Sequence, residues 1–477
     1  MNPRTSARVG ILLTIIIAAY AAIGTLYAAL TPTWQVPDEP AHYNYVRSVA
    51  EGEGFPVLEA RDYTQSYLER LTSERFPPDL SIEPLEYEDH QPPLYYLLAT
   101  PIYLLFDGAV LPLRLLSVAL GAGLLIVAFG TVRAVFPKRP ALALMAVAFI
   151  AFIPQHVAMS AGVNNDTLAE LVVGGTLWAL VEYVGSGSTV RPGSPQARTP
   201  RSMVRPGSPQ TQSARPGQHA TAELEQQRPW HVGLLLAAAL LTKTTAYVVV
   251  GVAAAAVALR WRRECRPSGW AARQLAWMLV PALLLSAPWF VRNGLTYGWT
   301  DPLGLARHES IVAGQPRSSE WLANYGWWGL LSRMARTTFQ SFWGQFGWMA
   351  VPLPSAIYRA LLLFSILLAV GFVIRLSRER RSQSSGLLVY QSTTLLVLSA
   401  LLTFAAFVWY NLTFVQHQGR YLFPALIPLA TAAALGLDTW TTALPRRLRT
   451  PAAAALFGCM AALALYSLCK SIPFLRR

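Results

Sequence analysis

The chain has 477 residues, of which 53% are hydrophobic and only 13% are charged, and its mean hydropathy is +0.35. Soluble domains carry about 25% charged residues, so this composition excludes an ordinary soluble domain and predicts a polytopic membrane protein. The net charge of +14 does not indicate nucleic-acid binding, because the basic residues lie in short stretches between apolar runs, as cytoplasmic loops do.

Apolar runs predict about eleven membrane crossings and therefore an all-α integral membrane fold. A further run at 93–106 rises only about 21 Å, so we expect a re-entrant or juxtamembrane helix there. The short runs at 231–241 and 244–259 predict a hairpin whose tip, near Lys243, points to the outer side. The runs expected to cross are residues 11–30, 110–135, 141–160, 166–184, 231–241, 244–259, 274–292, 356–375, 387–410, 421–440 and 451–469.

Three long segments outside these runs divide the chain. Residues 31–108 hold 14 of the 25 Asp and Glu residues, against four Arg and no Lys, which predicts a non-cytoplasmic loop. Residues 185–229 are rich in Pro, Gly, Ser, Gln and Arg and repeat VRPGSPQ at 190–196 and 204–210, which predicts a disordered cytoplasmic linker. Residues 293–355 contain six Trp, which favours an outer loop along the membrane surface. The expected units are an N-terminal transmembrane module at 1–184, the linker at 185–229, and a C-terminal transmembrane module at 230–477.

The first chemical candidate is the motif PDEPAHY, which follows the first apolar run by a few residues. Its acids, Asp38 and Glu39, lie at the membrane boundary, where a carboxylate can act as a general base or bind a metal ion. His42 and Tyr43 would then contact the substrate. The alternative is a solvated helix start, because the first turn of a helix favours acidic side chains.

Two further motifs, HQPPLYY and NNDT, precede apolar runs. In the first, the two prolines fix a helix start and would hold His90 and Tyr95 at the membrane surface as substrate-binding residues. The alternative is a plain helix start with interfacial aromatic residues. In the second, Asp166 supplies either a helix cap or a second carboxylate on the same face as Asp38.

Two basic residues stand at positions where charge is costly. The chain has 36 Arg but only three Lys, and Lys243 lies between two short apolar runs in the sequence LTK. Arg420 lies at the outer start of a run, in HQGRYLFP, with His417 and Tyr421 beside it. An ammonium and a guanidinium suit a lipid phosphate. The alternatives are a snorkelling lysine and an interfacial anchor.

No glycine-rich loop suited to a nucleotide is present, so an activated donor would have to be membrane-borne. The sequence leaves a divalent metal ion open as a cofactor. Its candidate ligands are Asp38, His90 and Asp166.

The ordered set of motifs resembles the GT-C glycosyltransferases. Within that superfamily the likeness is to the bacterial family-39-like and RgtA/B/C/D-like enzymes and to related uncharacterised membrane proteins. It extends from about residue 8 to 440. The motifs that carry it are Asp38-Glu39, HQPPLYY, Asn165-Asp166, LTK and GRYLFPALIP.

The resemblance implies a GT-C-like helical bundle and an inverting transfer of a sugar from a polyprenyl phosphate on the outer face. It assigns the catalytic acid after the first helix to Asp38. The implied partners are a polyprenyl-phosphate-linked sugar, the bilayer, and a glycan, lipid or protein acceptor. The implied location is the cell membrane, with the active site on the extracytoplasmic face. Two alternatives stay open, a carrier or flippase for a lipid-linked glycan and a non-catalytic relative.

Overall fold

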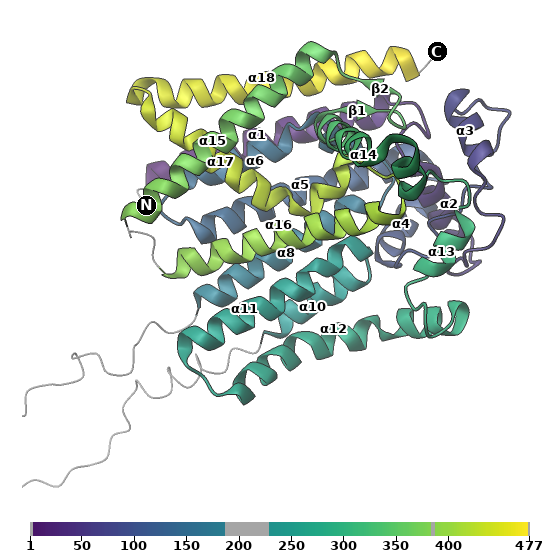
Figure 1. Cartoon of the computed structure of the whole chain (residues 1–477), viewed down its shortest axis with the longest axis horizontal. Helices are drawn as coiled ribbons and strands as arrows, with labels where there is room; N and C mark the ends of the chain where they lie inside the picture. The colour runs from purple at the N-terminus through teal and green to yellow at the C-terminus, as the bar shows by residue number, and fades with distance from the viewer. Residues whose placement is uncertain (1–2, 187–228, 383–386, 476–477) are drawn as a thin grey trace, which may run out of the picture.

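The computed structural model describes residues 3–186, 229–382 and 387–475, and this part of the chain is almost entirely helical (Figure 1). Its long helices run side by side in one bundle, which confirms the all-α membrane class. The expected linker at 185–229, with its VRPGSPQ repeat, lies almost wholly outside the described residues.

Nine helical segments of the described chain are long and apolar enough to cross a membrane. Two of the eleven runs expected to cross form shorter apolar helices, α6 (Pro140–Ala151) and α10 (Trp230–Leu240), which lie among the long ones (Figure 1). The nine are α1 (Pro3–Leu30), α5 (Val110–Val135), α8 (Asp166–Gly185), α11 (Val248–Glu264) with the preceding 3₁₀ turn η2 (Thr244–Tyr247), α12 (Ser268–Tyr297), α15 (Ser355–Ser382), α16 (Leu387–Thr413), α17 (Leu426–Ala443) with the preceding 3₁₀ turn η3 (Gly419–Ala425), and α18 (Arg446–Leu475).

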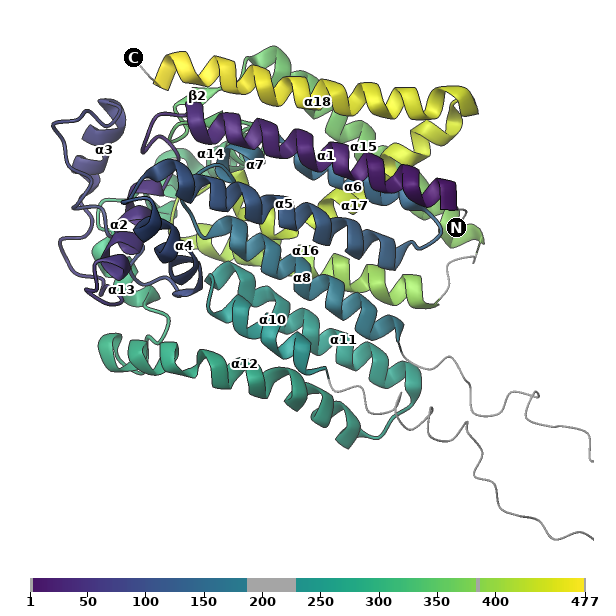
Figure 2. The same ribbon diagram turned by 180° about the vertical axis from the view of Figure 1, so that it is seen from behind.

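Short elements gather at one end of the bundle, called here the loop end, and the N-terminus lies at the opposite end (Figures 1 and 2). The two predicted outer loops therefore meet at the same end. The run at 93–106 forms a short helix there, as expected, and does not join the long helices. The elements at the loop end include α2 (Glu39–Ala50), α3 (Gln65–Ser73), α4 (Leu94–Leu105), α7 (Pro154–Met159), α13 (Leu305–Ile311), and the antiparallel pair β1 (Gln345–Phe346) and β2 (Val351–Pro352).

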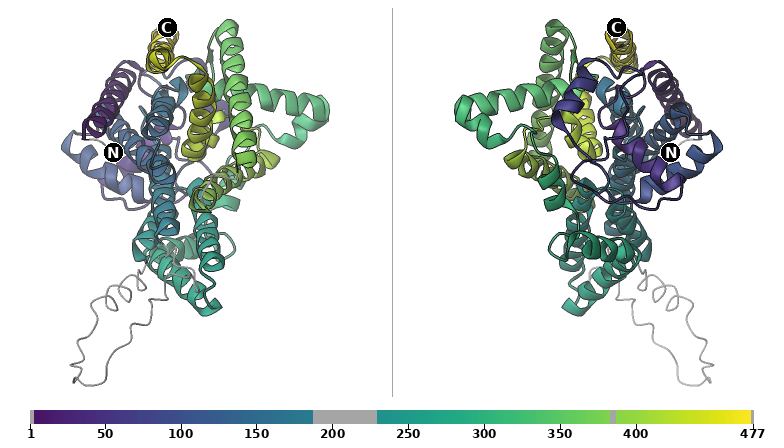
Figure 3. Two further views of the ribbon diagram at one scale, coloured as in Figure 1. Left: turned by 90° about the vertical axis from the view of Figure 1, so that its left-hand side faces the viewer. Right: turned by 90° about the vertical axis from the view of Figure 1, so that its right-hand side faces the viewer.

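Helix α14 (Ser318–Trp343) runs across the direction of the bundle and stands out to one side (Figure 3). It is kinked at Gly326, whose φ of 63° is a left-handed conformation that glycine adopts without strain. Trp327 and Trp328, next to the kink, are 68% and 84% exposed. This is the arrangement expected of a helix lying along a membrane surface.

A buried ion pair ties the loop at residues 31–108 to the bundle. The guanidinium of Arg114, in α5, donates two hydrogen bonds of 2.7 and 2.6 Å to the carboxylate of Glu39. It also donates to the carbonyl oxygens of Ala28 and Thr31 at the end of α1. Both members of the pair are almost fully buried, so one arginine fixes where α1 ends and where α2 begins.

We expect Glu39→Gln to lower the free energy of unfolding by about 3–5 kcal/mol, because it leaves the Arg114 charge buried without its partner. The matched control is Glu83→Gln, since Glu83 pairs with Arg47 at 3.6 Å but is 69% exposed. That control should change stability by under about 1 kcal/mol. Unfolding of the purified protein in detergent, followed by tryptophan fluorescence, measures both. Equal stability of the two variants would contradict the structural role of Glu39.

Candidate functional site

A cavity of about 360 Å³ lies at the loop end, where segments from both halves of the chain meet. Its lining comes from the α1–α2 connection, the residues before α4, the break between α10 and η2, and α13, α16 and η3. The hairpin tip at Lys243 therefore lies at the expected end. The predicted site residues that line the cavity are Asp38, His90, Lys243, Arg420 and Tyr421.

Four charged side chains form one connected network at this cavity. The guanidinium of Arg420 lies 2.5 Å from the Asp38 carboxylate and 3.9 Å from that of Asp166. Asp166 in turn accepts a 2.5 Å hydrogen bond from the Lys243 ammonium. Two anions and two cations thus balance, and each acid already contacts a base. The sequence placed these four residues on one face, and the structure brings them together.

Backbone geometry directs Asp38 into the cavity. Its φ of 66° is left-handed, a conformation that aspartate tolerates better than most residues do. The Tyr87 hydroxyl donates a 2.9 Å hydrogen bond to its second carboxylate oxygen. Burial alone raises the pKa of Asp38, but the Arg420 charge and the hydrogen bonds outweigh it and lower that pKa to about 2. Asp38 is therefore ionised at neutral pH.

The position of Arg420 depends on the glycine before it. The Gly419 amide donates a 2.7 Å hydrogen bond to the Ser341 hydroxyl of α14. A Cβ at Gly419 would collide with the backbone of Phe342 and Thr338, so only glycine lets η3 approach α14 this closely. The Nε of Arg420 is buried without a hydrogen-bond partner, and this leaves one donor free.

A second group of titratable side chains, which includes Glu88, lines the cavity beside this network. One carboxylate oxygen of Glu88 is buried without a partner, and burial raises the pKa of Glu88 to about 7. The His90 ring lies 4.6 Å from that of His308, in α13. Burial lowers the pKa of His308 to about 4, so this imidazole is neutral. The sequence did not predict Glu88 and His308 as site residues. Glu88 lies two residues before the HQPPLYY motif, and this proximity could have indicated it.

Three predicted residues lie away from the cavity because packing engages them elsewhere. Glu39 is bound by Arg114 and is therefore left out of the proposed catalytic set. The Tyr43 hydroxyl donates a 2.7 Å hydrogen bond to the Gly108 carbonyl. The Tyr95 hydroxyl lies 3.2 Å from the hydroxyl of Ser117, in α5, and its ring is fully buried.

Two predicted histidines are also buried behind the lining. Nδ1 of His42 lies 2.9 Å from the Tyr96 hydroxyl. Burial, followed by the Lys243 charge, lowers the pKa of His42 to about 3, so this ring is neutral. His417 is 4% exposed and packs its ring against Trp321. Neither side chain lines the cavity.

The three candidate metal ligands do not form a metal site in this arrangement. Arg420 and Lys243 already pair with the carboxylates of Asp38 and Asp166, and among the described residues these two acids and His90 do not bring their ligand atoms within 4.8 Å of one another. A divalent ion would need both acids released and brought to His90. We therefore derive no step that uses a metal ion at this cavity.

Two family models match separate parts of the chain. Residues 90–191 match the family described as dolichyl-phosphate-mannose-protein mannosyltransferase. This match covers about a fifth of the chain, which is a polytopic membrane protein by its apolar helices. Residues 219–429 match a family described as predicted membrane protein (DUF2142). The first match includes His90 and Asp166, and the second includes Lys243 and Arg420. No curated protein matches this sequence.

Solved structures of two enzymes are similar to the chain at low identity. The apo oligosaccharyltransferase of Archaeoglobus fulgidus has 13% identity and a TM-score of 0.49, with 96% of this chain and 56% of that chain covered. ArnT from Cupriavidus metallidurans in the apo state has 14% identity and a TM-score of 0.48, with 89% and 59% covered. ArnT bound to undecaprenyl phosphate has 13% identity and a TM-score of 0.44, with 91% and 60% covered. The chain thus spans less than two thirds of each of these proteins.

We expect Gly419→Ala to lower the free energy of unfolding by about 1–3 kcal/mol, because the added methyl group forces η3 away from α14. Gly458→Ala in α18 is the control, since nothing lies within 4 Å of a Cβ at that position. There, alanine should be neutral or stabilise by about 0.5–1 kcal/mol through its higher helix propensity. Thermal unfolding in detergent measures both variants. A Gly419→Ala protein as stable as the control would contradict the close approach.

Proposed function

We propose that the protein is a glycosyltransferase that moves a sugar from a polyprenyl-phosphate donor to an acceptor hydroxyl, with inversion, on the non-cytoplasmic face. The observation that carries the proposal is the cavity itself, in which an ionised carboxylate and two cations lie beside an apolar wall. A ligand that suits this lining has an anionic group and a long apolar part. The acceptor is a glycan, a lipid or a protein.

The apolar wall suits a lipid tail. It consists of side chains of α16, among them Phe407 and Trp409, and of Phe414, which directly follows that helix. Trp409 lines the cavity and is also 77% exposed, so the cavity reaches the outer surface of a membrane-spanning helix. An isoprenoid chain could leave the cavity along α16 and remain in the hydrocarbon layer.

The two cations suit a donor phosphate. Arg420 lines the cavity, and its guanidinium can turn from Asp38 to donate to a phosphate oxygen, with its unpartnered Nε as an additional donor. Lys243 supplies a compact charge that can move from Asp166 to the phosphate. Both charges would stabilise the polyprenyl phosphate as it leaves the sugar.

Asp38 would be the general base. The acceptor oxygen attacks the anomeric carbon, the bond from that carbon to the phosphate oxygen breaks, and the acceptor proton passes to Asp38. A single displacement of this kind inverts the anomeric centre. When Arg420 turns toward the phosphate, Asp38 loses part of the interaction that lowers its pKa, so donor binding makes it a stronger base.

Charge distribution supports the non-cytoplasmic face. The acidic loop 31–108 lies at the loop end, beside the cavity. Basic residues such as Arg139 and Arg375, which pair with Asp438 of α17, belong to the opposite end of the bundle. By the positive-inside rule, this distribution supports a cavity on the outer side.

We expect Asp38→Asn to reduce transfer by at least about 10²-fold, because the amide cannot accept the acceptor proton. Asp38→Glu should retain part of the activity, and Asp79→Asn, an exposed acid of the same loop, should retain all of it. The assay uses purified protein in nanodiscs with radiolabelled undecaprenyl-phosphate sugars and an acceptor mixture extracted from cell envelopes. Full transfer by Asp38→Asn would remove the mechanism. Donor binding without product in the unmodified protein would favour a carrier.

Lys243→Gln should weaken donor binding by about 10-fold, since one charge-assisted hydrogen bond to the phosphate is lost. Lys470→Gln, an exposed lysine near the end of α18, is the control and should bind normally. Equilibrium binding of radiolabelled undecaprenyl phosphate at two salt concentrations measures the effect. Unchanged affinity in Lys243→Gln would show that the lysine does not contact the phosphate.

A further inference from the structure

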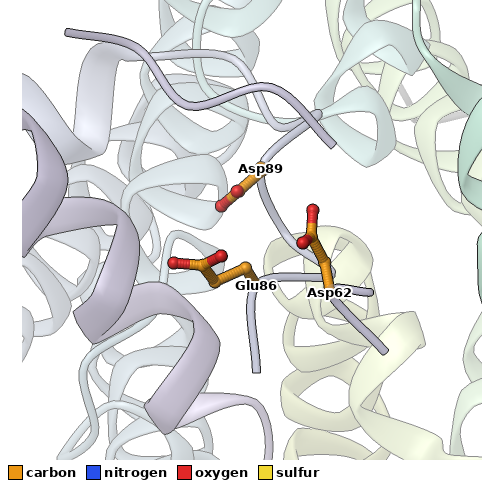
Figure 4. Close-up of side chains that lie close together, drawn as sticks. All are labelled: Asp62, Glu86 and Asp89. Atoms are coloured by element: carbon orange, nitrogen blue, oxygen red, sulfur yellow. The ribbon is translucent and has the colours of Figure 1, made fainter. Parts of the chain in front are cut away.

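A second cluster of acids lies outside the cavity, in the loop between α2 and α4. Asp62, Glu86 and Asp89 each place a carboxylate oxygen within 4.8 Å of the others. Figure 4 shows the three side chains close together, with Glu86 and Asp89 on one stretch of the loop and Asp62 on another. The backbone already joins these two stretches, since the Glu86 amide donates a 3.0 Å hydrogen bond to the Asp62 carbonyl.

Burial makes this cluster different from an ordinary group of surface acids. Asp62 and Asp89 are each only 2% exposed. Asp62 accepts a hydrogen bond from the Glu59 amide, but the Asp89 carboxylate has no hydrogen-bond or ion-pair partner among the described residues. A buried carboxylate without a partner is costly, and Asp89 is directed at two more negative charges.

Three arginines near the cluster form ion pairs or hydrogen bonds with other groups. Arg47 pairs with Glu83 at 3.6 Å. Arg292 donates to the carbonyl oxygens of Phe55 and Pro56. Arg307 donates to the Leu58 carbonyl. In the described parts of the chain, therefore, no arginine or lysine forms an ion pair with the three carboxylates.

We propose that Asp62, Glu86 and Asp89 bind a calcium ion that holds the α2–α4 loop in place. Ca²⁺ takes oxygen ligands at about 2.3–2.6 Å, so oxygens on opposite sides of the ion lie about 4.6–5.2 Å apart, which matches the spacing of the cluster. Three carboxylates offer up to six oxygens, and Ca²⁺ accepts six to eight in flexible geometry. Mg²⁺ requires a tighter octahedron, with ligands at about 2.1 Å, and fits this spread less well.

The site lies directly behind the cavity wall. Asp89 stands between Glu88 and His90, which both line the cavity. An ion bound to Asp89 would therefore fix the backbone that presents these two side chains. The proposal concerns loop stability and ion binding, and it does not depend on the transferase activity proposed above.

The test measures Ca²⁺ binding and thermal unfolding of the full-length protein in detergent, after treatment with EDTA. CaCl₂ at about 5 mM should raise the melting temperature of the unmodified protein by roughly 2–4 °C, and MgCl₂ should raise it less. Equilibrium binding of radioactive ⁴⁵Ca²⁺ should give one site per chain with a Kd of about 10⁻⁴–10⁻³ M, as in extracellular calcium modules.

Asp89→Asn is the decisive variant, because it keeps the shape of the side chain and removes one charge. In EDTA it should be at least as stable as the unmodified protein, since it relieves repulsion, and this shows that it folds. It should lose the calcium-dependent rise and at least about 10-fold in ⁴⁵Ca²⁺ affinity. Asp79→Asn, in the same loop but outside the cluster, should behave like the unmodified protein. Equal calcium response in Asp89→Asn, or no ⁴⁵Ca²⁺ binding by the unmodified protein, would overturn the proposal.

Discussion

The adjacent acids Asp38 and Glu39 are turned to opposite sides, and the rest of the loop end depends on this division. Glu39 is fully buried and accepts hydrogen bonds from Arg114 and from the backbone amides of Trp34 and Val163. Because a buried carboxylate needs such partners, its position is fixed. The preceding residue must then adopt a left-handed conformation, and this directs Asp38 into the cavity. Arg114 thus helps to position the Asp38 carboxylate, which it does not contact.

Charge balance explains how such a cavity can exist at a membrane boundary. Arg420 and Lys243 are neutralised by Asp38 and Asp166, so the donor-free state contains no unpaired charge within this network. A phosphate that enters the cavity would replace a carboxylate as the partner of each cation. The folded protein therefore does not have to bury an unpaired cation before the phosphate binds. Such an exchange costs less free energy than burying new charges, because both cations are already desolvated in the folded protein before a ligand binds. It also means that ligand binding would release Asp38 and Asp166 from their ion pairs with the two cations.

The sequence predicted the class of fold and the members of the charged network. It did not predict which neighbouring side chains reach the cavity, because tertiary packing determines this. Lys243 stood out because lysine is rare in this chain, and Arg420 because it lies at an outer helix end. The separate roles of Asp38 and Glu39 could not be predicted, since they depend on Arg114, 75 residues away from Glu39. Arg114 itself carried a signal that was not used, because a charge inside an apolar run is seldom without a partner. Tyr95 belongs to a motif that indicated the site, yet its hydroxyl lies against that of Ser117 in α5, away from the cavity.

The segment from Glu86 to Gln91 forms a partition between two groups of charges. Glu86 and Asp89 face the acidic cluster, whereas Glu88 and His90 line the cavity. Turn hydrogen bonds from the Asp89 amide to the Glu86 carbonyl and from the Gln91 amide to the Glu88 carbonyl hold this alternation. The cavity side has its own cations, but no arginine or lysine in the described chain pairs with the acids on the other side. Since repulsion among these acids acts on the same backbone that presents Glu88 and His90, the shape of the cavity wall depends on what neutralises the cluster behind it.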